Sequence, residues 1–578
     1  MTTALSYTKG ETDTPLLDVT IGESFRRNVA AHPHQDAIFE AETGRKWDYT
    51  QMRADVDAIA RALMGAGIQA GDLVGIWSPN CAEWTLIQYA TATMGAILVN
   101  INPAYRSHEL TFALNQCELR ALILAPKDRH TNYLQMALSV AHEVPAMTEI
   151  IQLPEPDTTP EPGRALVWPR SPNRPAETSV DLPATLELEH APQLYDWAEF
   201  LELADAVSQA QLDSRLAALR PEDEINMQYT SGTTGLPKGT TLTHANLINN
   251  GFSIGELLGY TPEDKIVLPV PFFHCFGMVI GNLAAYSHGA ATILPSRQFK
   301  PEPVLAAIEQ YGGTSLYGVP TMFIAELGLP NFDQYDLRTL RTGVMAGSNC
   351  PVKVMKDVID RMYMKEVAIC YGMTETAPVS TMTRVDDDLI RRTETVGRTM
   401  PHLETKIISV QDGAILPRGA VGELCTRGYS VMSRYWNDAA KTAEAVDAEG
   451  WMHTGDLASM DEHGYVKIEG RIKDMIIRGG ENISPREIEE FLYTHPAVQD
   501  VQVIGVPDEK YGEELLAAII LKDGAAALSA EDIREYCFDK LAHYKIPKYV
   551  QLRESFPMTV SGKIRKVQMR EEYITKLH

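Results

Sequence analysis

The sequence predicts an α/β protein, with a large amino-terminal domain of doubly wound sheets, a β-rich subdomain and a small α+β domain at the carboxyl end. Between Thr50 and about Leu124, segments with the apolar spacing of helices alternate with short apolar runs typical of strands. This alternation is the pattern of a doubly wound sheet. A second α/β rhythm runs from Ile225 to about Met382, and strand-like alternation follows it. With 578 residues, the chain is too long for a single core.

The first α/β section contains "VDAIARALMGAGI" and "EWTLIQYATATMGAI", which predict helices, and "DLVGIWS", "AILVNIN" and "RALILA", which predict strands. Between Pro154 and Pro192 the chain is rich in proline, which disfavours regular structure and indicates a surface excursion without chemistry. After the second α/β section, "HLETKIISV", "AVGELCTRG" and "GYVKIEGR" predict strands.

The stretch "YTSGTTGLPKGT", from Tyr229 to Thr240, is dense in glycine and hydroxyl residues. Small residues let backbone N–H groups approach an oxyanion, so this loop is a candidate phosphate site. It differs from the Walker pattern, because Pro237 precedes Lys238 and has no N–H to give. The strand-like "EINMQYT" before it and the helix-like "THANLINN" after it put the loop at a strand end, where α/β folds bind ligands. The alternative is a flexible surface linker.

The pattern changes at "GRIKD", so we predict a large domain at 1–470 and a small α+β domain at 471–578. Ser484 and Glu487 form an expected capping box with Pro485 at the first helical position. "VQVIGVPD" and "LLAAIILK" predict strands. Ser529 is expected to cap a last helix through "IREYCFDKLAHY".

Composition excludes several classes of protein. The net charge of −25 argues against nucleic acid as a main partner, because phosphate neutralisation needs stripes of Lys and Arg. The amino terminus shows no secretory pattern, and no run of 18 apolar residues predicts a spanning helix. The seven cysteines are scattered and never in C-x-x-C spacing, which fits a reducing compartment. We therefore expect a cytoplasmic protein, with a homodimer as an open alternative.

Five further motifs follow the loop in a fixed order: "PFFHCFG", "YGMTET", "WMHTGDL", "GRIKDMIIRGGENISPREIE" and "SGKIRK". Together with the loop they resemble the adenylate-forming superfamily of acyl-CoA synthetases, adenylation domains and luciferases. The resemblance covers nearly the whole chain. It implies that a carboxylic acid attacks the α-phosphate of ATP to give acyl-AMP and pyrophosphate, and that the acyl group then passes to a thiol. The implied cofactors are ATP, Mg²⁺ and coenzyme A.

The resemblance also assigns site residues. Those implied to act in catalysis are Lys563, Thr374, Glu375 and His274, with Glu375 as the magnesium ligand. Those implied to bind the nucleotide or CoA are Thr230, Ser231, Gly232, Thr233, Thr234, Gly235, Lys238, Gly347, Ser348, Tyr371, Gly372, Asp456, Arg471, Lys473, Gly479 and Gly480.

Each assignment has a chemical reason. Hydroxyls and Lys238 suit the β- and γ-phosphates, which need orientation, and a Glu375 carboxylate suits a hard cation. Asp456 can accept both ribose hydroxyl protons, and Arg471 assists it. Tyr371 offers an aromatic face for adenine.

Thr374 is expected to donate a hydrogen bond near the α-phosphate. His274 corresponds to a gate beside the acyl carboxylate, although a histidine among apolar residues is more often structural.

Lys563 is the strongest assignment, because a fixed cation between carboxylate and α-phosphate relieves charge in the adenylation transition state. Lys473 falls on the family's hinge position. The resemblance implies that the small domain is mobile, withdraws Lys563 after adenylation, and then presents Gly479 and Gly480 to the pantetheine arm.

The segments "KDMIIRGGENI", "EKYGEE" and "YGVPTMF" most resemble those of medium- and long-chain fatty acyl-CoA synthetases. The implied acyl pocket is apolar or small, formed by Phe272, Tyr317, Gly318, Met322, Met345 and Gly347. Two departures are Arg434, where relatives often have glycine, and Ser484, where many have tyrosine.

Three other readings stay open. The protein could be an aromatic acid–CoA ligase, or an acyl-AMP ligase serving a carrier protein. The most remote is a serine hydrolase at Ser253, because "GFSIG" matches the nucleophile-elbow pattern. An elbow needs a strand before its serine, whereas the spacing here is helical. A non-catalytic nucleotide-binding protein is disfavoured by the presence of both Lys563 and Glu375.

Overall fold

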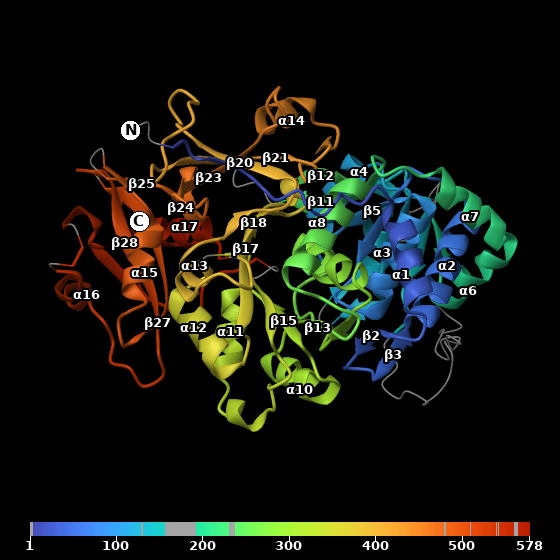
Figure 1. Ribbon diagram of the computed structural model, residues 1–578, viewed down its shortest axis with the longest axis horizontal. Coiled ribbons are helices and arrows are strands. Elements are labelled where there is room, and N and C mark those ends of the chain that lie inside the picture. The colour runs from blue at the N-terminus through green and yellow to red at the C-terminus, as the bar shows by residue number, and fades with distance from the viewer. Residues whose placement is uncertain are drawn as a thin grey trace.

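The computed structural model describes residues 4–128, 131–155, 192–230, 237–348, 350–478, 481–508, 510–538, 540–541, 543–559 and 564–577. Their strands form four main sheets, here called A to D (Figure 1). The strand order and the helices on both faces confirm the expected α/β class.

Sheet A is parallel from its β10 edge as far as β11, and β12 and β22 then add to it antiparallel. The strands in spatial order are β10 (Gln193–Tyr195), β9 (Glu149–Gln152), β6 (Ala121–Leu124), β4 (Leu73–Trp77), β5 (Ile97–Asn100), β11 (Glu224–Thr230), β12 (Lys238–Thr243) and β22 (Arg434–Tyr435). β11 and β5 were expected as strands. The sequence did not predict β12, which lies between the loop and the helix expected to follow it.

Sheet B is parallel from β17 to β2 and has antiparallel strands at both edges. Its order is β19 (Arg398–Thr399), β18 (Val379–Met382), β17 (Glu366–Gly372), β16 (Thr342–Met345), β15 (Ser315–Gly318), β13 (Lys265–Val267), β14 (Ala291–Leu294), β2 (Asp36–Glu40) and β3 (Arg45–Asp48). A two-stranded ribbon, β7 (Lys127–Asp128) with β8 (Thr131–Asn132), lies outside the sheets.

Helices pack against these two sheets, and the large apolar cluster between them includes fully buried Trp47, Trp84 and Tyr317. The helices are α1 (Ile21–Ala31), α2 (Tyr49–Gly65), α3 (Ala82–Met94), α4 (Ser107–Gln116), α5 (Tyr133–Val140), α6 (Trp197–Glu202), α7 (Gln209–Ala218), α8 (His244–Leu257), α9 (Ala284–Tyr286), α10 (Pro301–Tyr311), α11 (Pro320–Leu327), α12 (Val352–Arg361) and α13 (Leu389–Glu394). Short helical turns are η1 (Ala141–Glu143), η2 (Leu203–Ala206), η4 (Phe332–Gln334) and η5 (Thr374–Thr376), and η3 (Phe276–Leu283) is a π-helix.

Sheet C is antiparallel and lies across the top of the molecule in Figure 1. It consists of β1 (Tyr7–Lys9), β20 (Leu403–Ile408), β21 (Gly422–Gly428), β23 (Met452–Met460) and β24 (Val466–Arg471), with α14 (Ala439–Ala445) beside it. The strands expected from "HLETKIISV", "AVGELCTRG" and "GYVKIEGR" are therefore confirmed.

Sheet D belongs to the carboxyl-terminal part and has an apolar cluster of its own. It contains β25 (Ile476–Arg478), β26 (Glu481–Ile483), β27 (Val498–Asp508), β28 (Gly512–Leu521) and β29 (Tyr549–Leu552), with η6 (Ile472–Asp474), α15 (Pro485–Leu492), α16 (Ala530–Cys537), η7 (His543–Lys545) and α17 (Lys566–Leu577). The predicted boundary falls within the carboxyl end of β24, before its last residue, Arg471. The division into domains at 470 and 471 stays a prediction.

Two local predictions in this part were wrong. The Ser484 side chain does not cap α15, because its hydroxyl donates instead to the backbone carbonyl of Glu469 in sheet C. The last expected helix ends at Cys537 and does not reach Tyr544. By contrast, Ser529 forms the expected capping box with Asp532.

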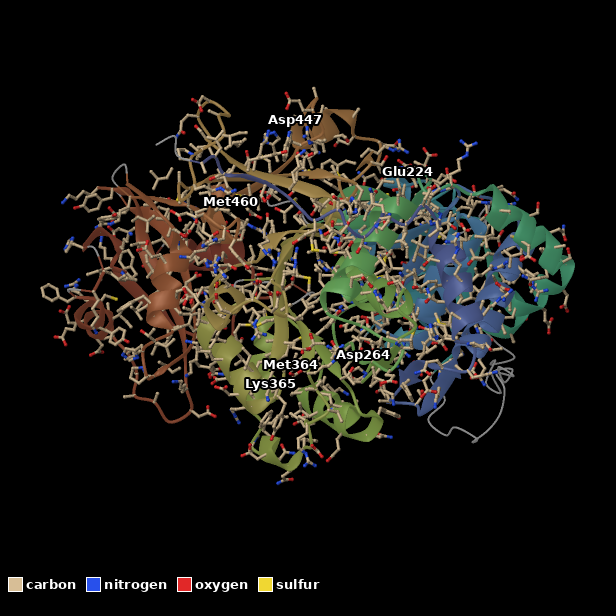
Figure 2. All side chains as sticks on the ribbon, in the orientation of Figure 1. Glu224, Asp264, Met364, Lys365, Asp447 and Met460 are labelled. Carbon is tan, nitrogen blue, oxygen red and sulfur yellow. The ribbon has the colours of Figure 1, made fainter. Side chains whose placement is uncertain are left out.

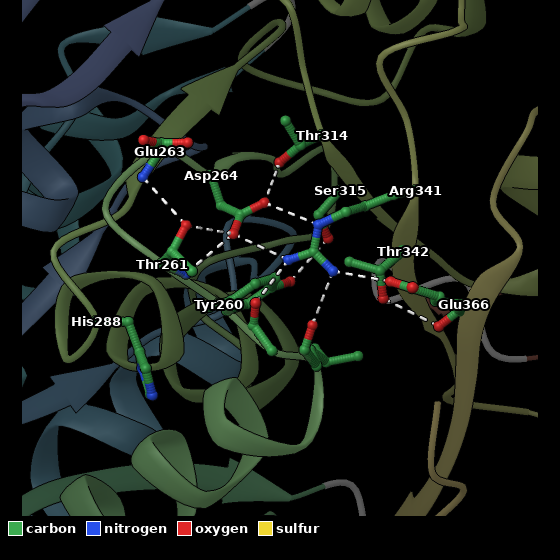
Figure 3. Close-up of polar contacts among 12 residues, drawn as sticks. Tyr260, Thr261, Glu263, Asp264, His288, Thr314, Ser315, Arg341, Thr342 and Glu366 are labelled. Carbon is green, nitrogen blue, oxygen red and sulfur yellow. Dashed lines mark hydrogen bonds and ion pairs between the residues drawn. The ribbon is translucent and has the colours of Figure 1, made fainter. Parts of the chain in front are cut away.

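The amino end of sheet B is closed by a network of charged groups (Figure 3). Arg341 bridges Asp264 and Glu366, with both N–O distances 2.9 Å, and Thr314 donates to Asp264 at 2.7 Å. These residues stand where β13, β15, β16 and β17 begin. Because this edge is filled by groups that satisfy one another, ligand chemistry is expected at the opposite, carboxyl edge.

Candidate active site

The candidate site lies where strands of sheets A and B end. Thr230 is the last residue of β11 and Gly372 the last of β17, and the segment Tyr371–Thr376 runs on from there. Three groups of side chains meet along this segment. Each group contains residues that the motifs assign to one part of the reaction.

The first group surrounds the carboxylate of Glu375, which is 6% exposed. Oε1 accepts a 2.8 Å hydrogen bond from the Tyr435 hydroxyl and lies 3.5 Å from Oγ1 of Thr230. Nζ of Lys238 lies over the ring of the same tyrosine, 4.7 Å from its centroid. Burial raises the pKa of Tyr435 above its ordinary value, and the neighbouring carboxylate raises it further, so the hydroxyl keeps its proton and donates.

This arrangement fits a magnesium ligand. Among the residues that the structure describes, Oε2 of Glu375 accepts no hydrogen bond, so one hard oxygen remains for a cation while the other orients the carboxylate. Thr230 and Lys238 are paired across β11 and β12, at the two ends of the glycine-rich loop. The two ends of the loop therefore lie side by side, and Thr230 lies beside the carboxylate.

The second group is formed by Tyr371, Asp456 and Arg471. The Tyr371 hydroxyl donates to Oδ2 of Asp456 at 2.6 Å, and Nε of Arg471 lies 3.3 Å from Oδ1. Burial and the adjacent carboxylate both raise the pKa of Tyr371, so this hydroxyl is also a donor. The Tyr371 hydroxyl therefore orients the carboxylate assigned to ribose. Its ring's role toward adenine stays a prediction.

Asp456 belongs to β23 and pairs with Arg471 of β24. On the other side of β23 the register is irregular: Cys425 faces His453, whereas Glu423 faces Leu457. β23 thus bulges between His453 and Leu457, and a bulge re-aims side chains beside a site. The backbone N–H of Gly455 in this bulge donates to Oε1 of Glu423 at 3.0 Å.

The third group contains His274, Cys275 and Thr374. Nδ1 of His274 accepts the backbone N–H of Phe276 at 3.1 Å, which fixes the ring at the beginning of η3. Sγ of Cys275 lies 3.5 Å from Nδ1 of His274 and 3.9 Å from Oγ1 of Thr374. His274 therefore has a structural function here. Its assignment to an acyl gate stays a prediction.

The assigned glycines have local reasons of their own. A Cβ at Gly372 would lie 1.7 Å from the carbonyl oxygen of Pro378, so no other residue fits there. Gly347 has a φ of +90°, which disfavours side chains, and the exposed Ser348 follows it. Within the described part of the chain, neither Gly347 nor Ser348 has a hydrogen bond or ion pair to a residue of the three groups.

Ser231, Gly232, Thr233, Thr234, Gly235, Gly479, Gly480 and Lys563 lie outside the described residues, and so does the side chain of Lys473. Most of the proline-rich stretch 154–192 also lies outside them.

The implied acyl residues divide between two apolar clusters. Phe272, Tyr317 and Met322 belong to the cluster between sheets A and B, where Tyr317 stacks on Phe276 with the ring centroids 5.9 Å apart. Met345 belongs to the second cluster, with residues such as Leu316. Tyr317 of β15 faces Val344 of β16, and successive residues of a strand point to opposite faces, so the Met345 side chain lies on the other face of sheet B from Tyr317.

The sequence did not predict two residues of the site. Tyr435 holds Glu375, and Glu423 holds the bulge that carries Asp456. No motif marked either residue, since both act through pairing between distant strands. The departure at Arg434 is explained: its guanidinium makes two hydrogen bonds, of 2.9 and 2.8 Å, to Glu224 of β11. Glu224 is labelled in Figure 2. Arg434 thus fastens β22 to sheet A.

The hydrolase reading is not supported. Ser253 lies within α8 and is 7% exposed, so "GFSIG" does not form a strand-to-helix elbow.

The chain belongs to the AMP-binding enzyme family: residues 25–436 match the model of that name, and residues 487–563 match the AMP-binding enzyme C-terminal domain. Within this family it is an AMP-forming acid–thiol ligase, an acyl-CoA synthetase that uses ATP, Mg²⁺ and coenzyme A. The expected resemblance is therefore confirmed.

The chain is 47% identical to "Putative acyl-CoA synthetase YngI" of Bacillus subtilis (strain 168), over 97% of this chain and 98% of that one. It is 41% identical to "Medium-chain acyl-CoA ligase ACSF2, mitochondrial" of Bos taurus, over 98% and 89% of the two chains. The crystal structure of ATP-bound MatB from Rhodopseudomonas palustris superposes with a TM-score of 0.80 at 26% identity, covering 96% of this chain and 99% of that one.

Within the described residues, every helix is too short or too polar to cross a membrane.

Proposed function

We propose that this ligase activates fatty acids of medium or long chain, and that the residues assigned above carry out the two half-reactions. The observation that carries the choice of acid is the shared apolar cluster of Phe272, Tyr317 and Met322. These buried side chains are apolar or aromatic, which suits an alkyl chain, and they carry no charge that would pair with a second carboxylate. The name of the bovine relative, a medium-chain acyl-CoA ligase, supports the same choice.

In the first half-reaction, the carboxylate of the acid attacks the α-phosphate of ATP and pyrophosphate leaves. Glu375 would hold the magnesium ion that accompanies ATP, with Thr230 and Lys238 at the two ends of the phosphate loop. Tyr435 keeps the Glu375 carboxylate in place, and its ring holds the Lys238 ammonium. Asp456 would accept the ribose hydroxyls, in an orientation fixed by the Tyr371 hydroxyl.

Two roles rest on the motifs alone. Lys563 would stabilise the charge that develops between the carboxylate and the α-phosphate. Rotation near Lys473 would then bring Gly479 and Gly480 to the thiol. A cytoplasmic location and a homodimer also remain predictions.

The test is a screen of acids of graded chain length, with benzoate, anthranilate and dicarboxylates included. Pyrophosphate release measures the first half-reaction, and thioester formation with CoA measures the second. We expect the highest kcat/KM for an alkyl monocarboxylate. A preference for an aromatic acid or a dicarboxylate would overturn the assignment. Thioester formation on a carrier protein but not on CoA would contradict the choice of acceptor.

A variant sharpens the screen. Met322 lies on α11 and is 7% exposed. Met322→Trp adds volume to the cluster and should move the optimum to shorter acids. Met136→Trp, on α5 beside a different apolar cluster, is the matched control and should leave the optimum unchanged. An unchanged optimum in Met322→Trp would remove this residue from the pocket.

A further inference from the structure

A group of metal-ligating side chains lies on sheet C, behind the bulge that carries Asp456. Cys425 of β21 faces His453 of β23, and Glu423 precedes Cys425 by two residues on the same strand, so their side chains share a face. The three ligand atoms, a carboxylate oxygen of Glu423, Sγ of Cys425 and a ring nitrogen of His453, lie within 4.8 Å of one another.

The distances suit one small ion. Nδ1 of His453 is 3.1 Å from Oε2 of Glu423 and 3.7 Å from Sγ of Cys425. Ligands around a tetrahedral zinc ion, at about 2.0 Å for N and O and about 2.3 Å for S, stand roughly 3.3 to 3.6 Å apart. The two separations therefore bracket the edges of such a tetrahedron without any movement of the backbone.

The surroundings also resemble those of a metal site. Nε2 of His453 lies 3.5 Å from Oδ2 of Asp447. In metal sites, a carboxylate on one ring nitrogen of a histidine commonly orients the imidazole so that the other nitrogen faces the ion. The second carboxylate oxygen of Glu423 is held by the Gly455 N–H. The Cys425 side chain is buried, whereas His453 is 31% exposed, so an ion could enter from the histidine side. Asp447 is at the upper edge of the molecule in Figure 2.

We propose that Glu423, Cys425 and His453 form a binding site for a divalent transition metal ion of the zinc class, separate from the magnesium site at Glu375. Three protein ligands leave the fourth position for water. A thiolate and an imidazole select such an ion over Mg²⁺, which prefers oxygen ligands. Glu423 also holds the bulge, and His453 directly precedes it in the chain. The ion would therefore lie next to the segment that positions Asp456.

Binding involves a balanced exchange of a proton. The thiol of Cys425 must lose its proton to solvent when sulfur coordinates the ion. Metal affinity should therefore rise with pH, and binding should release a proton.

The experiment is a titration of the full chain with Co²⁺, after treatment with a chelator and without ATP. We expect one ion per chain, with a thiolate-to-cobalt charge-transfer band and the visible bands of a tetrahedral ion. Zn²⁺ should abolish the spectrum, because it binds such ligands more tightly than Co²⁺. An excess of Mg²⁺ should leave the spectrum unchanged.

The variants locate the ion. Cys425→Ser should remove the charge-transfer band, and His453→Gln should weaken binding at least tenfold. Cys537→Ser, at a buried cysteine in the sheet D part, should retain the band, and so should Glu375→Gln at the magnesium site. A band that persists in Cys425→Ser, or a folded wild-type chain that binds no Co²⁺, would overturn the proposal. Should Cys425→Ser not fold, Glu423→Gln serves instead, and unchanged affinity in that variant counts against the site.

Discussion

Glu375 and Tyr435 are 60 residues apart in the sequence, and the tyrosine hydroxyl donates a 2.8 Å hydrogen bond to the glutamate carboxylate. The same ring carries the Lys238 ammonium on its face. A single side chain from the edge strand β22 thus organises the carboxylate and the cation that the motifs assign to magnesium and phosphate.

Removal of this hydroxyl should disturb magnesium use. Tyr435→Phe keeps the ring under Lys238 but loses a hydrogen bond to a charged group, which contributes about 1.5–3 kcal/mol. We expect the magnesium concentration for half-maximal pyrophosphate release to rise about tenfold or more. The control is Tyr465→Phe, whose hydroxyl donates to Asp387 away from the site. Equal magnesium dependence in both variants would contradict the role of Tyr435.

Glu375→Gln should have a stronger effect of the same kind. The amide keeps the shape and can still accept from Tyr435, but it lacks the charge that holds a divalent cation. Magnesium activation should weaken more than the KM for the acid. Titration of pyrophosphate release with Mg²⁺ and with the acid separates the two effects. If magnesium dependence does not change, the metal is held elsewhere.

Asp456→Asn tests the ribose contact. The neutral amide is a poorer acceptor for two hydroxyl groups, so the KM for ATP should rise about tenfold. The variant should also discriminate less than the wild type between ATP and 2′,3′-dideoxy-ATP. Asp412→Asn, in an exposed turn after β20, is the control. Undiminished discrimination in Asp456→Asn would remove the carboxylate from the ribose site.

Lys563→Ala should separate the half-reactions. Loss of a preorganised charge lowers acyl-AMP formation by a factor on the order of a hundred or more. Supplied with synthetic acyl-AMP and CoA, the variant should still make thioester.

Lys473→Pro should show the reverse, because a fixed φ at the hinge hinders rotation and lets acyl-AMP accumulate on the enzyme. Rapid-quench assays of the two steps make the comparison. If both variants lose both steps equally while remaining folded, the rotation of the small domain is refuted.

Asp55 gives a stability prediction. Burial raises the pKa of its carboxyl to about 7, from an ordinary value of 3.8, although the indole N–H of Trp47 donates to it at 2.8 Å. The folded state therefore holds a proton that the unfolded state has lost, and stability falls as pH rises from about 4 to about 7. Above that range the full cost of the buried charge remains.

Asp55→Asn should remove this cost and still accept from Trp47. We expect the variant to unfold at higher denaturant concentration than the wild type at pH 8, with the difference vanishing near pH 4. Urea unfolding at several pH values measures it. A difference that does not change with pH would show that the carboxyl is not perturbed as described.

The sequence by itself determined the class of fold and the chemistry. Alternating apolar segments specified sheets A and B, because helices and strands bury their apolar residues with different periods. Six motifs in order specified the adenylate-forming family, because the phosphates, the metal and the ribose each demand particular residue types. Local signals such as the Ser529 capping box were also sufficient, since both partners lie within one turn.

The tertiary structure decided what depends on pairing between distant strands. β12 separates the glycine-rich loop from α8, and the hydroxyl of Ser484 bonds to Glu469 instead of capping its own helix. Tyr435 reaches Glu375 because β22 joins the edge of sheet A. The bulge in β23 aims Asp456, and it brings Glu423 and His453 together. None of these contacts follows from a local pattern, because strand register and side-chain partners are chosen by packing across the whole sheet.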